Sequence, residues 1–159
     1  TVSWRDKIST RLPSNSAVHH FDIFPTIVSA AKTTTSNKKE LDGVNLLPYI
    51  KKENSDEPHE TLFWRSGNHQ SVLHKKWKYI VSKKENKSWL FDTSVDPLEK
   101  NNLIESHPKE AQKIEELLVQ FNSEQKEPLF PSAFEAPIMI DKYDGQAYEE
   151  GDEYIYWSN

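Results

Sequence analysis

The sequence has 159 residues, enough for one ordinary domain or for a small domain together with part of another. Only 35% of the residues are hydrophobic, yet five Trp, six Tyr and seven Phe exclude a disordered chain. The net charge of -5 argues against nucleic acid or an anionic membrane as the main partner. The lack of cysteine excludes disulfide bonds, thiolate metal sites and a cysteine nucleophile.

The first four residues, "TVSW", are β-branched and aromatic, which predicts a strand. A single strand at a terminus has no local partner to pair with. We therefore expect the chain to begin inside a larger protein.

The stretch "HHFDIFPTIVSAA" (residues 19–31) predicts a helix. Asp22 occupies the position of an N-cap, and Pro25 lies in the first turn, where its missing N–H costs nothing. Apolar residues then recur at helical spacing. The next motif, "LDGVNLLPYIKK", predicts a turn and a short helix, and the polar run "ENSDEPHE" marks a domain boundary after residue 53.

Four strand-like runs follow, and the polar breaks between them are short, which predicts antiparallel hairpins: "TLFWRSG", "QSVLHK", "WKYIVSK" and "SWLFDT". The segment "HPKEAQKIEELLVQF" then predicts an amphipathic helix that covers one side of the sheet. Its apolar face consists of Ala111, Ile114, Leu117, Leu118 and Phe121. The predicted class is therefore α+β, a four-stranded antiparallel sheet covered by one C-terminal helix, in a small domain at residues 54–127.

Residues 128–159 have no helical period and are acidic, so we expect an extended tail that wraps the body of the domain. The side chains expected to hold it are Phe130, Phe134, Ile138, Tyr154, Tyr156 and Trp157.

The histidines offer few sites for chemistry. His19 and His20 are adjacent and cannot both face one ion, and no His-X-X-X-His pair exists. His59 and His107 lie in polar linker sequence, where a surface hydrogen bond explains them. His69, in the turn "SGNHQ", is the better functional candidate, because loop tips can reach a neighbouring cleft. Asp42, Asp92 and Asp96 are each explained by turn formation.

In order along the chain, "HHFDIFPTIVSAA", "LDGVNLLPYI", "TLFWRSGNHQSVLHKKWKYI" and "WLFDTSVDPLEKNNLIESHP" resemble the C-terminal part of type I sulfatases. These are the formylglycine-dependent enzymes of the alkaline phosphatase superfamily. Their Trp-Lys-hydrophobic strand is matched at residues 77–79, and their Leu-Phe-Asp-X-X-X-Asp-Pro turn at residues 90–97. The tail is a weaker match to N-acetylgalactosamine-4-sulfatases. Several motifs in the right order make a stronger signal than any one of them.

The resemblance implies that residues 1–53 are the end of a truncated α/β catalytic domain, because the sulfatase motif Cys/Ser-X-Pro-X-Arg is absent. Its nearest approach starts at Ser106, but Glu110 stands in the place of the arginine. The family's calcium ligands have no counterpart either, so no catalytic or metal residue is assigned to this chain. Formylglycine and calcium are implied for the parent enzyme only. Its N-terminal catalytic part is the expected partner, and a periplasmic or secreted bacterial location is expected.

The resemblance also implies a substrate, a sulfated carbohydrate or an aryl sulfate, with one wall of its cleft supplied by this chain. His20 is a candidate contact. In "FWRSGNH", Trp64 offers a stacking plane, Arg65 a clamp for an anion and His69 a donor to a hydroxyl. Strand alternation sends Trp64 and Arg65 to opposite faces unless the strand has already ended. The alternative places Trp64 in the core and leaves Arg65 solvated.

Two other functions stay open from the sequence. A phosphonate or phosphate ester hydrolase of the same superfamily shares this helix and small domain. A non-catalytic β-sheet module that binds a partner or a glycan is the other, although "TVSW" and "FDIFPTIV" would then leave an unpaired strand and an apolar helix face.

Overall fold

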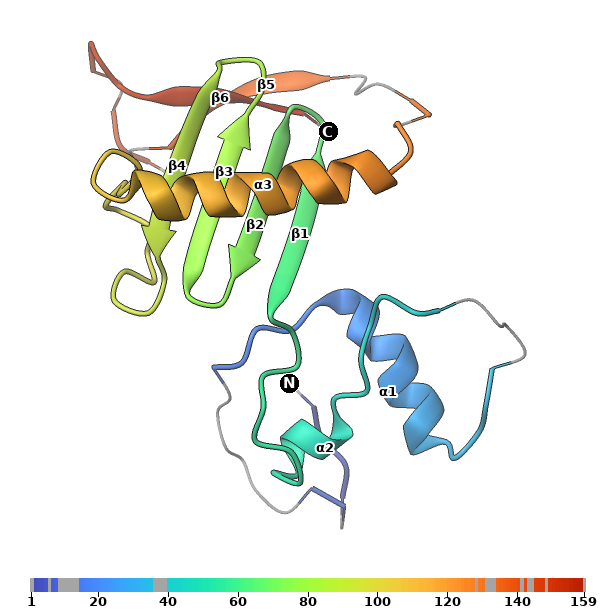
Figure 1. Cartoon of the computed structure of the whole chain (residues 1–159). Helices are drawn as coiled ribbons and strands as arrows, with labels where there is room; N and C mark the ends of the chain where they lie inside the picture. Colours follow the sequence, from blue (N-terminus) through green and yellow to red (C-terminus); the bar gives the residue numbers. More distant parts are fainter. Residues whose placement is uncertain are drawn as a thin grey trace. The chain divides into compact units, whose positions relative to one another are not determined.

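The computed structural model describes residues 2–5, 7–8, 15–35, 40–127, 129–130, 134–140, 142, 145–147 and 149–158. For residues 156–158 it describes the backbone alone. The chain divides into two compact units, residues 1–60 and 61–159 (Figure 1). Residues 54–60, expected to open the small domain, therefore belong to the first unit. The acidic tail belongs to the same unit as the sheet.

The first unit is built from short helices. They are a 3-10 helix η1 (His20–Asp22), α1 (Ile23–Ala30) and α2 (Leu47–Ile50). The two predicted helices are thus present, with Pro25 in the first turn of α1. Residues 2–4 form no strand, and Thr1 lies outside the described residues. An isolated strand has no hydrogen-bonding partner, which is the physical reason for this difference from the sequence-based expectation.

The second unit contains the predicted four-stranded antiparallel sheet, in the order β1-β2-β3-β4. The strands are β1 (Thr61–Ser66), β2 (His69–His74), β3 (Trp77–Ser82) and β4 (Lys87–Asp92). Each pairs with the next through a short connection, as expected for consecutive hairpins. Asn102 covers the outer edge of β4, because its Oδ1 accepts the N–H of Leu90 at 3.0 Å.

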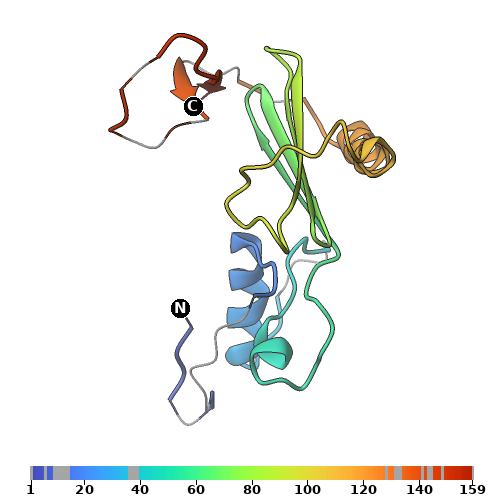
Figure 2. The ribbon, with the colours of Figure 1, turned by 90° about the vertical axis from the view of Figure 1, so that its left-hand side faces the viewer.

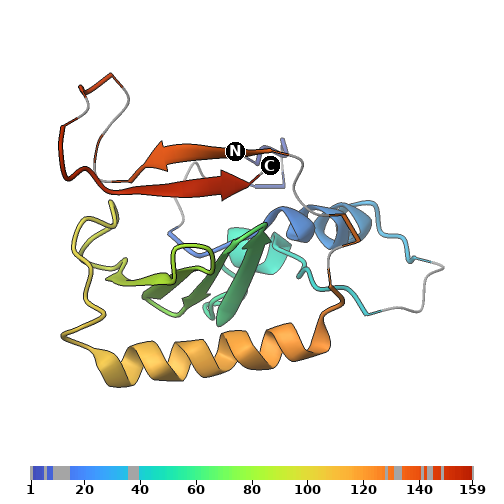
Figure 3. The same ribbon diagram turned by 90° about the horizontal axis from the view of Figure 1, so that it is seen from above.

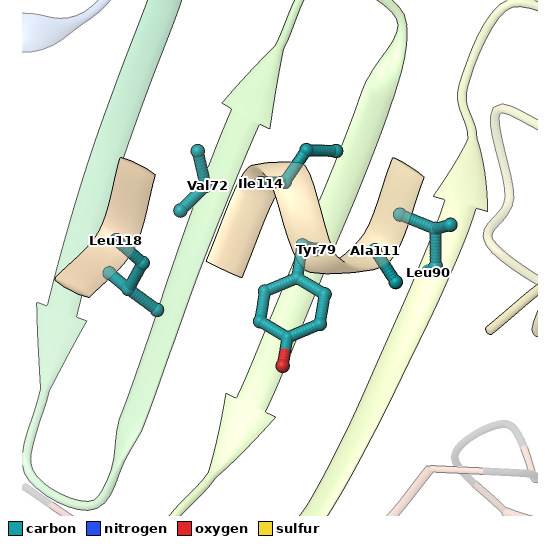
Figure 4. Packing of buried hydrophobic residues seen from close by; sticks show 6 residues of the cluster. All are labelled: Val72, Tyr79, Leu90, Ala111, Ile114 and Leu118. Carbon is teal, nitrogen blue, oxygen red and sulfur yellow. The ribbon is translucent and has the colours of Figure 1, made fainter. Parts of the chain in front are cut away.

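The helix α3 (Pro108–Glu124) lies across one face of the sheet (Figure 1). Figure 4 shows the core between them, in which side chains from three neighbouring strands meet side chains of the helix. The buried cluster consists of Val72, Tyr79, Leu90, Ala111, Ile114 and Leu118. Phe63 and Phe121 stack at its margin, with ring centroids 4.3 Å apart. The predicted apolar face of the helix is confirmed.

The tail differs from the expected extended arm, since it contains an antiparallel pair, β5 (Glu135–Met139) and β6 (Tyr154–Ser158). Figures 2 and 3 show this hairpin on the face of the sheet opposite α3. Ile155 is its buried contact, packed against Trp89 and Phe91. Phe130 and Phe134, two expected anchors, are exposed. Ile138 and Tyr154 are also largely exposed. The side chains of Tyr156 and Trp157 lie outside the described residues.

Candidate functional site

Asp22 is the most constrained polar residue of the first unit. Its side chain is fully buried and accepts hydrogen bonds from three directions. The N–H of His19 donates to Oδ2 at 2.7 Å, and the N–H of Val44 donates to Oδ1 at 2.9 Å. His59 Nε2 lies 2.9 Å from both oxygens. Asp22 therefore joins the start of η1, the Leu-Asp-Gly motif and the linker before β1.

The same contacts correct the expected role of Asp22. It stands at the N-cap position of α1, but its side chain makes no capping hydrogen bond to that helix. The physical reason is that its oxygens already accept hydrogen bonds from His19, Val44 and His59, and a buried carboxylate requires such donors.

The two sulfatase-like motifs of the first unit pack against each other. A Cβ on Gly43 would lie 2.2 Å from the carbonyl oxygen of Phe21, so only glycine allows the two backbones to approach this closely. The N–H of Leu46 donates to Thr26 Oγ1 at 2.9 Å, and the Asn45 side chain donates to Ser29 Oγ at 3.0 Å. These contacts explain why the two motifs contain glycine, asparagine and threonine at these positions.

Burial alone raises the pKa of Asp22, but hydrogen bonds from the backbone of His19 and Val44 and from His59 outweigh it, so the pKa lies below its ordinary value. Burial and the neighbouring His20 lower the pKa of His19. The site therefore holds a buried carboxylate anion, stabilised by donors.

His20 is exposed at the start of η1. Its ring centroid lies 4.2 Å from that of His19 and 5.9 Å from that of Phe21. Of the four proposed substrate contacts, His20 belongs to the first unit and the other three to the second, and each unit is described by itself.

Trp64 and Arg65 both lie within β1, so the strand has not ended and their side chains point to opposite faces of the sheet. Arg65 pairs in register with Gln70, whose side chain bonds to Asn122 of α3, so Arg65 is on the α3 face. Trp64 is on the opposite face, the one on which the β5–β6 hairpin lies, and is 36% exposed. One strand therefore does not bring this stacking plane and this cation together.

His69 is the first residue of β2 and is buried, whereas the sequence placed it in a turn. Its Nε2 lies 3.1 Å from the buried Ser82 Oγ, and that hydroxyl also donates to Glu85. The hydroxyl stands between the imidazole and the carboxylate. A nucleophilic triad needs the imidazole in the middle, so this cluster is not one. Burial lowers the pKa of His69.

Two aspartates have the predicted turn roles. Asp92 accepts the N–H of Ser94 at 3.1 Å, and Asp96 accepts the N–H of Asn101 at 2.8 Å. Across the described part of the chain, no three or more His, Asp or Glu side chains are grouped to hold a metal ion. No helix there is long and apolar enough to cross a membrane.

Comparison with known proteins adds to this geometry. No family model matches the chain. The chain is 33% identical over 63 residues to YdeN of Escherichia coli strain K12, named an uncharacterized sulfatase. The aligned segment covers 38% of this chain and 11% of YdeN. The crystal structure of Ps i-CgsB superposes with a TM-score of 0.60 at 18% identity, covering 73% of this chain and 26% of that one. The structure of BT1596, titled a 2-O GAG sulfatase, superposes with a TM-score of 0.54 at 23% identity. The superposition covers 64% of this chain and 24% of BT1596.

The chain matches a C-terminal segment of sulfatases. The sulfatase resemblance drawn from the sequence motifs is confirmed, together with the α+β fold. The chain spans about a quarter of the length of the solved structures and 11% of the curated relative, so it corresponds to a part of those sulfatases.

Sequence reasoning missed His59 as part of the site. Its neighbours are polar and its partner Asp22 lies 37 residues away, so no local pattern signals the pair. The one available signal is Asp22 itself, an acidic residue inside an otherwise apolar stretch.

Proposed function

We propose that this chain is part of an enzyme that hydrolyses sulfate esters, and that it supplies scaffold and one wall of the substrate cleft. The observation that carries the proposal is the sulfatase-like order of parts. The motifs joined through Asp22 and Gly43 precede a four-stranded sheet covered by α3. The nucleophile and the calcium site belong, in this proposal, to an N-terminal catalytic part. The described residues offer no group of ligands for a metal, so no step is assigned to one here.

The surface of α1 supports a partner for the first unit. Ile23, Phe24 and Ile27 are 58%, 53% and 60% exposed, and no residue of this apolar helix is buried. An apolar face of this kind is unfavourable in water and is expected to pack against another protein surface. The N-terminal catalytic part of the same enzyme is the partner that we propose.

The proposed substrate is a sulfated carbohydrate or an aryl sulfate. His20 in the first unit, and Trp64 and Arg65 on opposite faces of the sheet in the second, are proposed as separate contacts. His69 is buried and would act by shaping the β1–β2 hairpin. The name of BT1596 as a GAG sulfatase supports the carbohydrate over the aryl group.

The test is to express the full-length product of the gene that encodes this chain and to assay it on an aryl sulfate, an aryl phosphate and an aryl phosphonate. We expect cleavage of the sulfate ester, at least tenfold faster than of either phosphorus ester. The 159-residue chain alone serves as the control and should be inactive. Preferred cleavage of a phosphorus ester would favour the phosphonate or phosphate hydrolase instead.

A further inference from the structure

A cavity of about 880 Å³ lies in the second unit, between β4, the loop at residues 98–102 and the β5–β6 hairpin. Its apolar lining includes Trp89, Phe91 and Ile155, which pack together as a small core. Leu98 and Ile140 also line it, yet they are 67% and 40% exposed. The volume is within the range of small-molecule sites, roughly 300–1,000 Å³, whose walls are mostly apolar with a few polar groups.

Two lysines of the lining differ in how firmly they are held. Lys142 Nζ donates to Ala147 O at 2.9 Å and lies 2.8 Å from Asp152 Oδ1, and its side chain is only 14% exposed. Lys87 Nζ lies 2.9 Å from Glu153 Oε1, and these two side chains are 44% and 39% exposed. A solvent-exposed pair of this kind exchanges its partner at little cost. Of these two lysines, Lys87 is therefore the one that a ligand can recruit; a third lysine, Lys100, also lines the cavity.

The chain already places an anion and an apolar group side by side at this cavity. Glu153 and Ile155 are two residues apart in extended chain, so their side chains lie on the same face. Glu153 binds Lys87, while Ile155 packs against Trp89. Leu98 and Ile140 line the same cavity. Its chemistry therefore matches a molecule that carries an anion beside an apolar body.

We propose that this cavity binds a small amphipathic anion, an organic sulfate, sulfonate or carboxylate attached to an aromatic or branched aliphatic group. The anion replaces the Glu153 carboxylate on Lys87, and the apolar body fills the space beside Leu98 and Ile140. The site lies wholly within residues 61–159 and is independent of sulfate-ester hydrolysis, so its test requires no turnover.

The test is a calorimetric titration of the 159-residue chain with naphthalene-2-sulfonate. Lys87→Gln should weaken binding about fivefold, as expected for the loss of a partly exposed ion pair. Glu153→Gln should tighten binding about fivefold, because it removes the competing carboxylate. Lys84→Gln is the matched control. Lys84 also pairs with a carboxylate of the β5–β6 hairpin, Glu135, but neither residue lines the cavity. The Kd of naphthalene-2-sulfonate for Lys84→Gln should therefore equal that of the wild type.

The opposite signs of the two variants separate ligand binding from hairpin docking. If Lys87 and Glu153 served only to hold the hairpin, both substitutions would change the affinity in the same direction. Leu98→Asp tests the apolar part without touching the core, and it should abolish binding. Each of three results would overturn the proposal: a titration without saturable binding, equal effects of Lys87→Gln and Lys84→Gln on the Kd, or equally tight binding of inorganic sulfate.

Discussion

His59 Nε2 lies 2.9 Å from each of the two carboxylate oxygens of Asp22. His59 is only 9% exposed by its side chain and Asp22 is fully buried, so the pair is shielded from water. It ties the linker that precedes β1 to the beginning of α1. Because a buried carboxylate is costly without donors, the pair and the two backbone N–H groups form one structural unit.

Asp22→Asn should destabilise the first unit by about 2–4 kcal/mol, because the amide replaces one acceptor by a donor that faces the N–H of either His19 or Val44. The measurement is amide hydrogen exchange at Val44, which should accelerate. Asp56→Asn, at an exposed aspartate of the same unit, is the control and should leave the exchange unchanged. Unaltered protection of Val44 in Asp22→Asn would show that the carboxylate does not hold this motif.

The first unit should lose stability in acid. The pKa of Asp22 is lowered in the folded state from its ordinary value of 3.8, so the unfolded chain takes up a proton first as the pH falls. The contribution of Asp22 is complete above pH 3.8 and is lost between that value and the lower folded pKa. Exchange at Val44 should therefore accelerate more steeply below about pH 4 in the wild type than in Asp22→Asn. Equal slopes for the two proteins would contradict this.

Gly43→Ala should cost about 3 kcal/mol, because the new Cβ collides with the backbone of Phe21, which cannot rotate away. Gly151→Ala separates this collision from backbone strain. Gly151 has a φ of 99°, and a Cβ added there would have nothing within 4 Å, so about 1 kcal/mol of backbone strain is expected. Chemical denaturation of both variants, followed by the exchange of reporter amides in each unit, measures the difference.

Leu118→Asp should unfold the second unit, because the carboxylate would be placed among Val72, Tyr79 and Ile114 without a partner, at a cost of several kcal/mol. Val119→Asp is the matched control, since Val119 is the next residue and is 63% exposed. The control should change stability by less than about 0.5 kcal/mol. Thermal melting followed by circular dichroism compares them. Equal midpoints for both variants would show that α3 does not cover the sheet.

In the full-length enzyme, Arg65→Ala should raise KM for a sulfated glycan about fivefold and leave the cleavage of a small aryl sulfate nearly normal. His69→Ala should raise the same KM and also lower the melting temperature, because it removes the buried partner of Ser82. Lys83→Ala, at an exposed position of the β3–β4 turn, is the control. Equal kinetics of Arg65→Ala and Lys83→Ala on both substrates would remove Arg65 from the substrate site.

Local pattern was sufficient for most elements of the second unit. The four strands and α3 follow from alternation, short polar breaks and a helical repeat of apolar residues. Neighbouring strands in the sequence are also neighbours in the sheet. The placement of Trp64 and Arg65 on opposite faces was likewise available, because side-chain parity is a property of the strand itself.

The tail shows where local pattern fails. β5 and β6 are separated by an acidic stretch, and Pro137 lies inside β5, so neither segment has a strong strand signature. Their pairing, and the burial of Ile155 against the sheet, depend on surfaces formed by β3 and β4. The exposure of Phe130 and Phe134 shows that hydrophobicity alone does not select the anchor.

The sequence by itself determined the motif order, the sheet and its covering helix, because these depend on residues close together in the chain. Only the tertiary structure decided that Asp22 binds His59 rather than capping α1, and that His69 is buried. Both outcomes depend on donors and surfaces that lie far away in sequence. A buried polar side chain takes whichever partner the assembled fold brings within hydrogen-bond reach, and the local pattern does not contain that information.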